Sequence, residues 1–255
     1  KSLVVKDNAL VNASYDLDLV EQRLVLLAIV EARESGKGIN ANDPLVIHAE
    51  SYINQFKVHR NTAYQALKDA CKYLFARQFS YQEEKDNGTV RNVTSRWVSQ
   101  IAYNDNEASV DLIFAPAVVP FITRLEERFT KYELEQVSNL KSAYAIRLYE
   151  LLIQWRSIGK TPVIRLDEFR KKVGVLDNEY LRMAHLKERV IDLAIKQINE
   201  HTDITMTYEQ HKTGRIITGF SFKFKQKQSI PNERTEKAAL KDLNTIDMFH
   251  KLTEK

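Results

Sequence analysis

The feature that most constrains this fold is an order of secondary-structure elements that the sequence predicts twice. A long amphipathic helix, a short strand, a short helix, a basic helix and a β-hairpin are predicted from Leu17 to Phe114, and again from Ser142 to Lys227. The two segments share almost no sequence, so the repeat is one of pattern. Helix–helix–hairpin units with an exposed basic helix are typical of winged-helix modules. We therefore predict an α+β chain of two tandem winged-helix domains.

Composition fits a folded chain of about two domains. Hydrophobic residues make up 44% of the 255 residues, and 7 Gly and 5 Pro are too few for a loop-rich protein. No apolar run approaches the roughly 18 residues of a membrane helix, and residues 1–10 lack a signal-peptide core. Because the only cysteine, Cys71, cannot form an internal disulfide, we expect a reducing, cytoplasmic location.

Charge is unevenly distributed between the predicted domains. Residues 1–141 contain 17 Lys and Arg against 19 Asp and Glu, whereas residues 142–227 contain 16 against 10. The tail, residues 228–255, contains 5 of each and is expected to be flexible. The positive field of the second domain favours a polyanion as its partner. From charge alone, an ordinary solvated basic surface is an equal alternative.

In the first copy, apolar periodicity and capping residues predict three helices and one strand. The expected elements are a helix from a cap at Asp16 or Asp18 to Arg33, a strand at Leu45–Ile47, a helix at Ala49–Phe56, and a helix at about Thr62–Arg77 capped by Asn61 or Thr62.

The last of these helices has a predicted buried stripe and a polar outer face. Arg60, Asn61 and Gln65 lie near its start, and Tyr64 and Lys68 share another face, which is what a groove-facing helix needs. An ordinary solvated face is slightly favoured over that interpretation. The buried stripe is expected to contain Ala63, Ala66, Leu67, Ala70, Cys71, Leu74 and Phe75, with Cys71 as a core residue.

Strand signals follow in the first copy. Strands are predicted at Gln78–Gln82, Thr94–Tyr103 and Val110–Phe114, with a mobile hairpin tip at Glu83–Asn92. A helix from Pro116 to Phe129 is expected to close the domain.

In the second copy, the same order of elements can be followed. We expect a helix capped by Ser142 and stopped at Gly159, a strand at Val163–Leu166, a helix at Glu168–Val173 capped by Asp167 and stopped by Gly174, a helix from about His185 to His201, and strands at Ile204–Glu209 and Ile216–Phe224.

The predicted helix from His185 to His201 is the strongest candidate for a nucleic-acid contact. Arg189 and Lys196 are seven residues apart and so share its outer face, and Arg182 and Lys187 flank its start. Arginine can pair with guanine, and both residue types anchor phosphates. Asp192 either accepts from a cytosine amine or, as we favour, holds Arg189. The expected buried stripe is Leu186, Val190, Leu193, Ala194 and Ile198.

The final predicted hairpin has basic residues around its turn. Lys212 and Arg215 lie in the turn between the two strands, where a wing would rest on a phosphate backbone. The alternating residues Phe220, Phe222 and Phe224 are interpreted as core packing, not as a base-stacking surface.

Several segments of the chain together resemble a known family. They are Arg128-Phe129-Thr130, Tyr144-Ala145-Ile146-Arg147-Leu148-Tyr149-Glu150, Ile198-Asn199-Glu200 with Thr202, and Phe220-Ser221-Phe222. These segments resemble the RepE/RepB-type plasmid replication initiator family, and Val5–Leu24 and His48–Tyr52 are most similar to initiators of small plasmid-like circular DNAs. The resemblance covers about residues 3–227, in order and with similar spacing, and the run from Tyr144 to Glu150 is fairly specific to the family.

The resemblance implies a protein that binds tandem origin repeats (iterons) in duplex DNA, starts replication with host proteins, and represses its own promoter as a homodimer. The second domain would be the main DNA reader, whereas the first would dimerise and support binding. One member of the family has an unbroken basic triplet where this chain has Lys187-Glu188-Arg189, so either different bases are read here or Arg189 contributes most of the contact. The implied contacts are Arg182, Lys187 and Arg189, and, in the first domain, Arg60, Asn61, Thr62, Tyr64 and Lys68.

Three alternatives to an initiator make different predictions. A winged-helix transcriptional repressor without an initiator role would bind one inverted repeat and no tandem repeats. A structural dimerisation module would bind DNA independently of salt. A nickase needs a metal held by closely spaced histidines, but the six histidines form no His-x-His pair, and no phosphate-binding loop is present. We therefore expect no enzyme activity, no catalytic residues, no metal and no cofactor.

Overall fold

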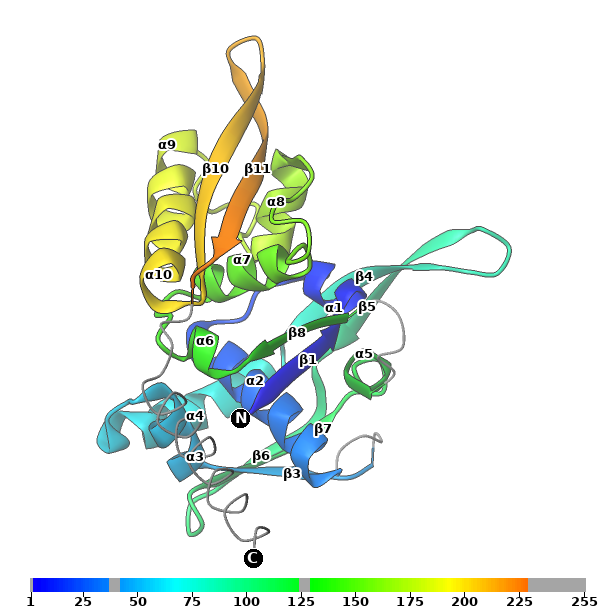
Figure 1. Ribbon diagram of the computed structural model, residues 1–255. Coiled ribbons are helices and arrows are strands. Elements are labelled where there is room, and N and C mark those ends of the chain that lie inside the picture. Colours follow the sequence, from blue (N-terminus) through cyan, green and yellow to red (C-terminus); the bar gives the residue numbers. More distant parts are fainter. Residues whose placement is uncertain (1, 37–41, 124–128, 229–255) are drawn as a thin grey trace, which may run out of the picture. The chain divides into compact units, whose positions relative to one another are not determined.

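The first winged-helix domain is built from three helices and a three-stranded sheet. A computed structural model describes residues 2–36, 42–123 and 129–228 (Figure 1). The helices of the domain are α2 (Leu19–Ser35), α3 (Ala49–Phe56) and α4 (Arg60–Leu74), and its strands are β3 (Leu45–His48), β6 (Val98–Asn104) and β7 (Ser109–Phe114). The sheet has the order β3-β7-β6, so the strand after the first helix pairs with the last strand of the hairpin.

The second domain repeats this connectivity. Its elements are α7 (Ala143–Ile153), β9 (Ile164–Arg165), α8 (Leu166–Val173), a helical segment at Met183–His201, β10 (Ile204–Thr213) and β11 (Ile216–Gln226). The sheet order β10-β11-β9 again places the early strand beside the last one. Gly219 is required at this pairing, because a Cβ there would lie 2.5 Å from the carbonyl oxygen of Ile164. The predicted repeat of two winged-helix units is therefore confirmed in the topology.

The first domain also contains a hairpin that its counterpart lacks. Strands β4 (Gln78–Glu84) and β5 (Val90–Arg96) lie between α4 and β6, and pair with β2 (Ser14–Tyr15) in a separate sheet (Figure 1). The single predicted strand Thr94–Tyr103 is wrong, because the chain leaves one sheet and enters another at Trp97. This indole is fully buried, 4.8 Å from the ring of Tyr15. The predicted tip at Glu83–Asn92 is also too long, since β4 and β5 run together to residues 84 and 90.

The N-terminal segment adds a further sheet. Strand β1 (Leu3–Asp7) pairs antiparallel with β8 (Phe129–Glu133), and α1 (Asn8–Asn12) connects β1 to β2. The helix predicted from Pro116 to Phe129 is wrong over most of its length. Helix α5 covers only Val119–Thr123, residues 124–128 lie outside the described residues, and Phe129 begins β8. Helix α6 (Glu135–Ser138) then leads to α7.

Several helix ends were predicted correctly and others were not. Asp18 caps α2 in a capping box with Glu21, as expected for one of the two candidate caps. Helix α4 starts at Arg60 after His59, so Asn61 and Thr62 lie inside its first turn and are not caps. Similarly, α8 is preceded by Arg165, and Asp167 lies in its first turn.

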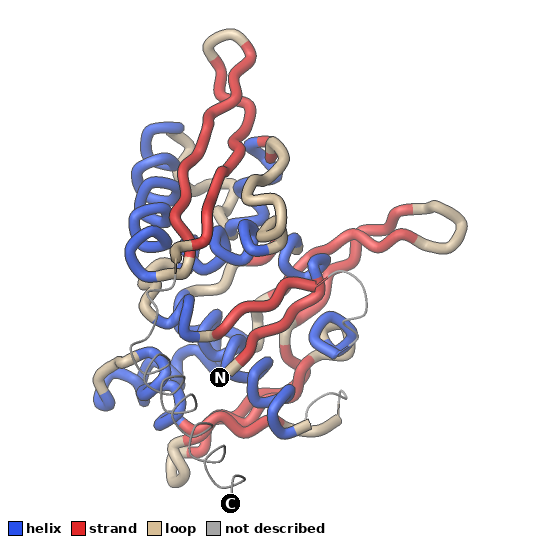
Figure 2. Tube along the Cα trace, in the orientation of Figure 1, coloured by secondary structure: helices blue, strands red, loops and turns tan. Residues whose placement is uncertain are grey.

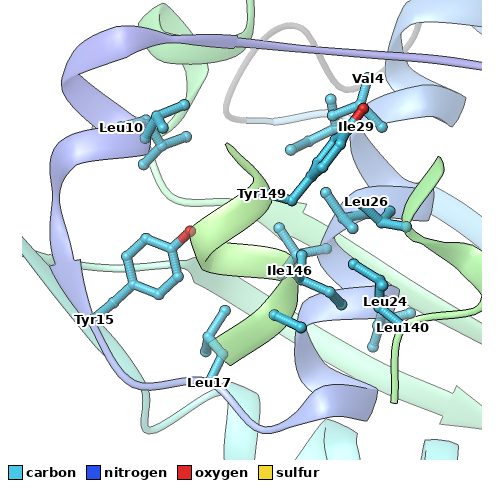
Figure 3. Close-up of a cluster of buried hydrophobic side chains, with 14 of the residues drawn as sticks. Val4, Leu10, Tyr15, Leu17, Leu24, Leu26, Ile29, Leu140, Ile146 and Tyr149 are labelled. Carbon is cyan, nitrogen blue, oxygen red and sulfur yellow. The ribbon is translucent and has the colours of Figure 1, made fainter. Parts of the chain in front are cut away.

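A buried apolar cluster spans both domains. Figure 3 shows Ile146 and Tyr149 of α7 among Leu24, Leu26 and Ile29 of α2. Phe220, Phe222 and Cys71 are also buried, as predicted, whereas Phe75 is exposed because α4 ends one residue before it. Residues 1–225 form one unit, and the tail residues 229–255 lie outside the described residues. The domain boundary between residues 141 and 142 stays a prediction.

Candidate nucleic-acid interface

The recognition helix of the second domain, Met183–His201, contains a π-helical segment. It consists of α9 (Met183–Leu186), a π segment (Lys187–Asp192) and α10 (Leu193–His201), which follow one another without a break (Figure 2). The predicted start at His185 is two residues late. A π segment bonds each residue to the fifth one along instead of the fourth, so it fits one more residue into a turn.

This extra residue changes which side chains face the core. Ile191 is fully buried, although the helical pattern did not select it. Leu193 is 41% exposed, so its predicted place in the buried stripe is wrong. In a regular α-helix Leu193 would lie two turns after Leu186 on the same face. The π segment moves Leu193 outward, whereas Ala194 is buried as predicted.

The predicted basic residues of the recognition helix occupy its exposed side and its start. Arg189 and Lys196 are exposed, Lys187 is half-buried, and Arg182 is the exposed residue that precedes the helix. Asp192 does not hold Arg189 as predicted. Its carboxylate accepts a hydrogen bond of 3.2 Å from the hydroxyl of Tyr208 in β10. Arg189 is therefore left available for an external anion, although Asp192 remains close along the helix.

The β10–β11 hairpin, or wing, is held against the recognition helix by polar contacts. Asn199 exchanges two hydrogen bonds with the backbone of Met206, of 2.6 Å and 3.0 Å. Burial and the nearby Asp192 raise the pKa of Tyr208 to about 12, so the hydroxyl stays a donor to that carboxylate at neutral pH. The hairpin and the helix therefore present one continuous surface.

The wing strands are longer than predicted. Lys212 lies within β10, and the turn itself is Gly214-Arg215, with Gly214 at φ 61°. Both Lys212 and Arg215 are exposed. The predicted basic tip therefore has one cation in the turn and one on the adjoining strand.

The candidate residues of the first domain do not form a comparable set of available cations. Arg60 donates to Glu50 at 2.6 Å, and Lys68 pairs with Asp105 while lying 5.2 Å from the centre of the Tyr103 ring. The Asp105 carboxylate raises the pKa of Lys68. The other three candidates lie on the first turns of α4: Asn61 and Thr62 are exposed, and Tyr64 is half-buried.

A buried charged network joins strands β1 and β8 to helix α7, and no local pattern in the sequence predicts it. Lys6 of β1 donates to Glu150 of α7 at 2.7 Å, and Tyr132 of β8 donates to the same oxygen at 2.6 Å. Arg147 donates to the carbonyl of Ala13 at 2.8 Å and lies 3.6 Å from Glu150. Burial alone would raise the pKa of Glu150, but Lys6 and Arg147 outweigh it and lower that pKa.

A second feature that depends on the tertiary fold is a cleft between α8 and the β4–β5 hairpin. It has a volume of about 700 Å³, and its lining includes Arg165, Lys171, Gln82 and Asn92. Arg165 and Lys171 follow Gln82 and Asn92 by 73 to 89 positions in the chain, so no local pattern could have predicted the cleft.

No group of three or more metal-ligating side chains was found among the described residues. Within the same residues, no helix is long and apolar enough to cross a membrane.

Comparisons with known proteins identify the class that this architecture defines. Residues 3–153 match the family described as Initiator Replication protein, WH1, and residues 165–224 match Initiator Rep protein, WH2. The chain belongs to this family of winged-helix replication initiator proteins. The resemblance predicted from the sequence is thereby confirmed.

Individual relatives agree with this assignment. An Escherichia coli replication initiation protein is 25% identical over 218 residues, which cover 84% of this chain and 66% of that protein. An uncharacterised 27.6 kDa Escherichia coli protein is 27% identical over 232 residues, 85% of this chain and 93% of that one.

Two solved structures are also similar. The structure of Pi initiator protein in complex with iteron DNA has a TM-score of 0.71 and 23% identity, covering 90% of this chain and 99% of that one, which supports the fold. The WH1 domain of MSBI1.176, a replication protein isolated from a multiple sclerosis patient, is 76% identical over 48% of this chain and 92% of that one, with a TM-score of 0.41.

Proposed function

We propose that this protein binds tandem iterons in duplex DNA at a plasmid-like origin and thereby starts replication. The observation that carries the proposal is the recognition helix with exposed Arg189 and Lys196, fixed beside a basic wing, in a member of the replication initiator family. An α-helix fits the major groove of B-DNA, and a wing can follow the adjoining backbone. The Pi initiator, which shares this fold, was solved in complex with iteron DNA.

Within this proposal, the second domain reads bases and the first domain supports it. Arg189 is assigned to a base edge, since its side chain leaves the outer face of the recognition helix. The remaining second-domain contacts are to the backbone or groove edge: Arg182, Lys187, Lys196, Lys212 and Arg215. First-domain contacts come from the start of α4, where Asn61 and Thr62 are exposed. Arg60 and Lys68 contribute less, because each is already paired with a carboxylate. Tyr64 also contributes less, because it is half-buried.

The proposal extends to regulation and partners. A homodimer formed through the first domain would repress the initiator's own promoter, and host replication proteins would be recruited to the bound origin in the cytoplasm. The β6–β7 hairpin supports the dimer proposal, because β6 is at the edge of its sheet and leaves a row of backbone groups unpaired within the sheet. The protein itself would contribute no catalytic step.

Footprinting on the replicon that encodes the protein tests the proposal. Protection of tandem repeats beside an origin is the expected result. Protection of a single inverted repeat, with no tandem repeats, would instead support a repressor without an initiator role. Sedimentation tests the dimer: we expect the sedimentation coefficient to rise with concentration, and a monomer at all concentrations would contradict it.

A further inference from the structure

Leu193 is an unusual residue for the outer side of a recognition helix. Among residues 183–201, all of which the structure describes, it is the one large apolar side chain that is exposed, at 41%. The other large aliphatic side chains of this segment are buried or half-buried. An exposed leucine in the middle of a helix is common by itself. Only its position on the helix can therefore indicate a functional role.

The position follows from the π segment that precedes it. With regular α-helical spacing, the residue three after the buried Val190 would return to the core. The π segment ends at Asp192, directly before Leu193, and Ala194 stays on the core face. Single π turns inside α-helices occur frequently at functional sites. Here the turn moves the leucine off the buried face and presents it to the outside.

Leu193 lies between the two exposed cations of the helix. Arg189 is four residues before it and Lys196 three residues after it, and all three side chains are exposed on the outer side of the helix. This is the face that the proposed function places against the major groove. Asp192 is turned toward the wing by its hydrogen bond with Tyr208, and so does not cover the leucine from that side.

We propose that Leu193 is a specificity-determining residue that packs on the 5-methyl group of a thymine. The inference rests on the proposed function and names one base that the protein would recognise in the DNA site. The C5-methyl of thymine is the apolar group that base pairs expose in the major groove, and apolar side chains contact it. The leucine side chain cannot form a hydrogen bond with any base. Its contribution to affinity should therefore be lost when the methyl group of the thymine is removed.

Helix geometry gives the position of this thymine relative to the contact of Arg189. Four residues of helix advance at most about 6 Å, because an α-helix rises roughly 1.5 Å per residue and the π segment fits more residues into a turn. Successive base pairs are about 3.4 Å apart. The thymine should therefore lie within about two base pairs of the guanine that Arg189 contacts.

The experiment uses the full chain and a binding site selected from a random duplex pool. Each thymine of the selected site is replaced singly by deoxyuridine, and affinities are measured for the unmodified protein, Leu193→Ala and Leu193→Gln. At one position, the unmodified protein should lose about fourfold in affinity, corresponding to roughly 0.8 kcal/mol for one buried methyl group. Both variants should bind the thymine and uracil duplexes equally well at that position.

A matched control is available in Leu176, which is 45% exposed in the loop after α8. Leu176→Ala should keep the fourfold discrimination. Equal thymine-to-uracil losses in the unmodified protein and both Leu193 variants would overturn the inference while leaving specific DNA binding intact. Failure to select any preferred site would instead overturn the proposed function, so the two failures are distinguishable.

Discussion

Replacing Lys6 by methionine tests whether the buried charged network holds the N-terminal strand on α7. Lys6 and Glu150 are 3% and 0% exposed, and their side-chain atoms are 2.7 Å apart. Methionine keeps most of the apolar stem and removes the ammonium group. Glu150 then remains in the interior with Arg147 at 3.6 Å and the hydroxyl of Tyr132 as its partners.

The expected loss of stability can be set from this geometry. Removing one partner of a buried ion pair lowers the free energy of unfolding by about 3–5 kcal/mol, because it leaves an uncompensated charge. Since Arg147 and Tyr132 still contact Glu150, we expect the lower end, about 3 kcal/mol. For a protein of this size, such a loss lowers Tm by roughly 6–12 °C.

The sign of the pH dependence gives a second readout. The pKa of Glu150 is lowered in the folded protein, so its stabilising contribution is complete above the unfolded carboxyl pKa of about 4.3 and is lost as pH falls through the folded value. Lys6→Met removes the charge and the hydrogen bond of Lys6, both of which lower that pKa against the effect of burial, so the pKa of Glu150 should rise in the variant. The variant should therefore regain stability relative to the unmodified protein as pH falls from about 7 to 5.

Urea unfolding followed by tryptophan fluorescence measures both effects. The double variant Lys6→Met/Glu150→Gln completes a thermodynamic cycle, and we expect it to be more stable than the sum of the single losses by at least about 1 kcal/mol. Additive losses within about 0.5 kcal/mol would show that the two groups do not interact. A single variant as stable as the unmodified protein would refute the reasoning as a whole.

Three further predictions concern DNA binding and the domain junction. Arg189→Ala should weaken specific binding by about 1–3 kcal/mol and random-DNA binding less, and equal losses in competition assays would exclude base reading. Lys212→Ala and Arg215→Ala should each reduce the salt slope of binding by about one, and an unchanged slope would remove them from the backbone contacts. Gly174→Ala should lower Tm more than Gly36→Ala. Both glycines have positive φ, but only at Gly174 would a Cβ meet a carbonyl oxygen of β2, at 2.8 Å.

Local patterns in the sequence predicted the elements whose signals lie within a few neighbouring residues. The span of α3 and the cap of α2 at Asp18 were correct, because apolar spacing and a capping box are encoded within a few residues. The second-domain hairpin was found for the same reason. Strand β1 was missed, since five residues of strand have meaning only beside β8, which is more than a hundred residues away.

The errors in the predicted recognition helix share one physical source. Leu193 and Asp192 were placed by assuming a regular α-helix, but the π segment changes the residue spacing before both. Ile191 was missed for the same reason, and it is fully buried. The charge balance predicted the second domain as the positive one, whereas it could not show that Arg60 and Lys68 are neutralised by carboxylates from other elements.

Helix α7 links the recognition helix to the rest of the protein more closely than a tandem repeat requires. One side of it holds Lys6 and the N-terminal strand through Glu150. At its start, the side chain of Gln197 in the recognition helix accepts from the backbone amides of Lys141 and Ser142, at 2.8 Å and 3.1 Å. A rotation of the recognition helix would therefore disturb the start of the same helix that anchors the first domain. Two winged helices joined only by a linker would have no such connection, so the repeated pattern here describes two units that share a helix and a core.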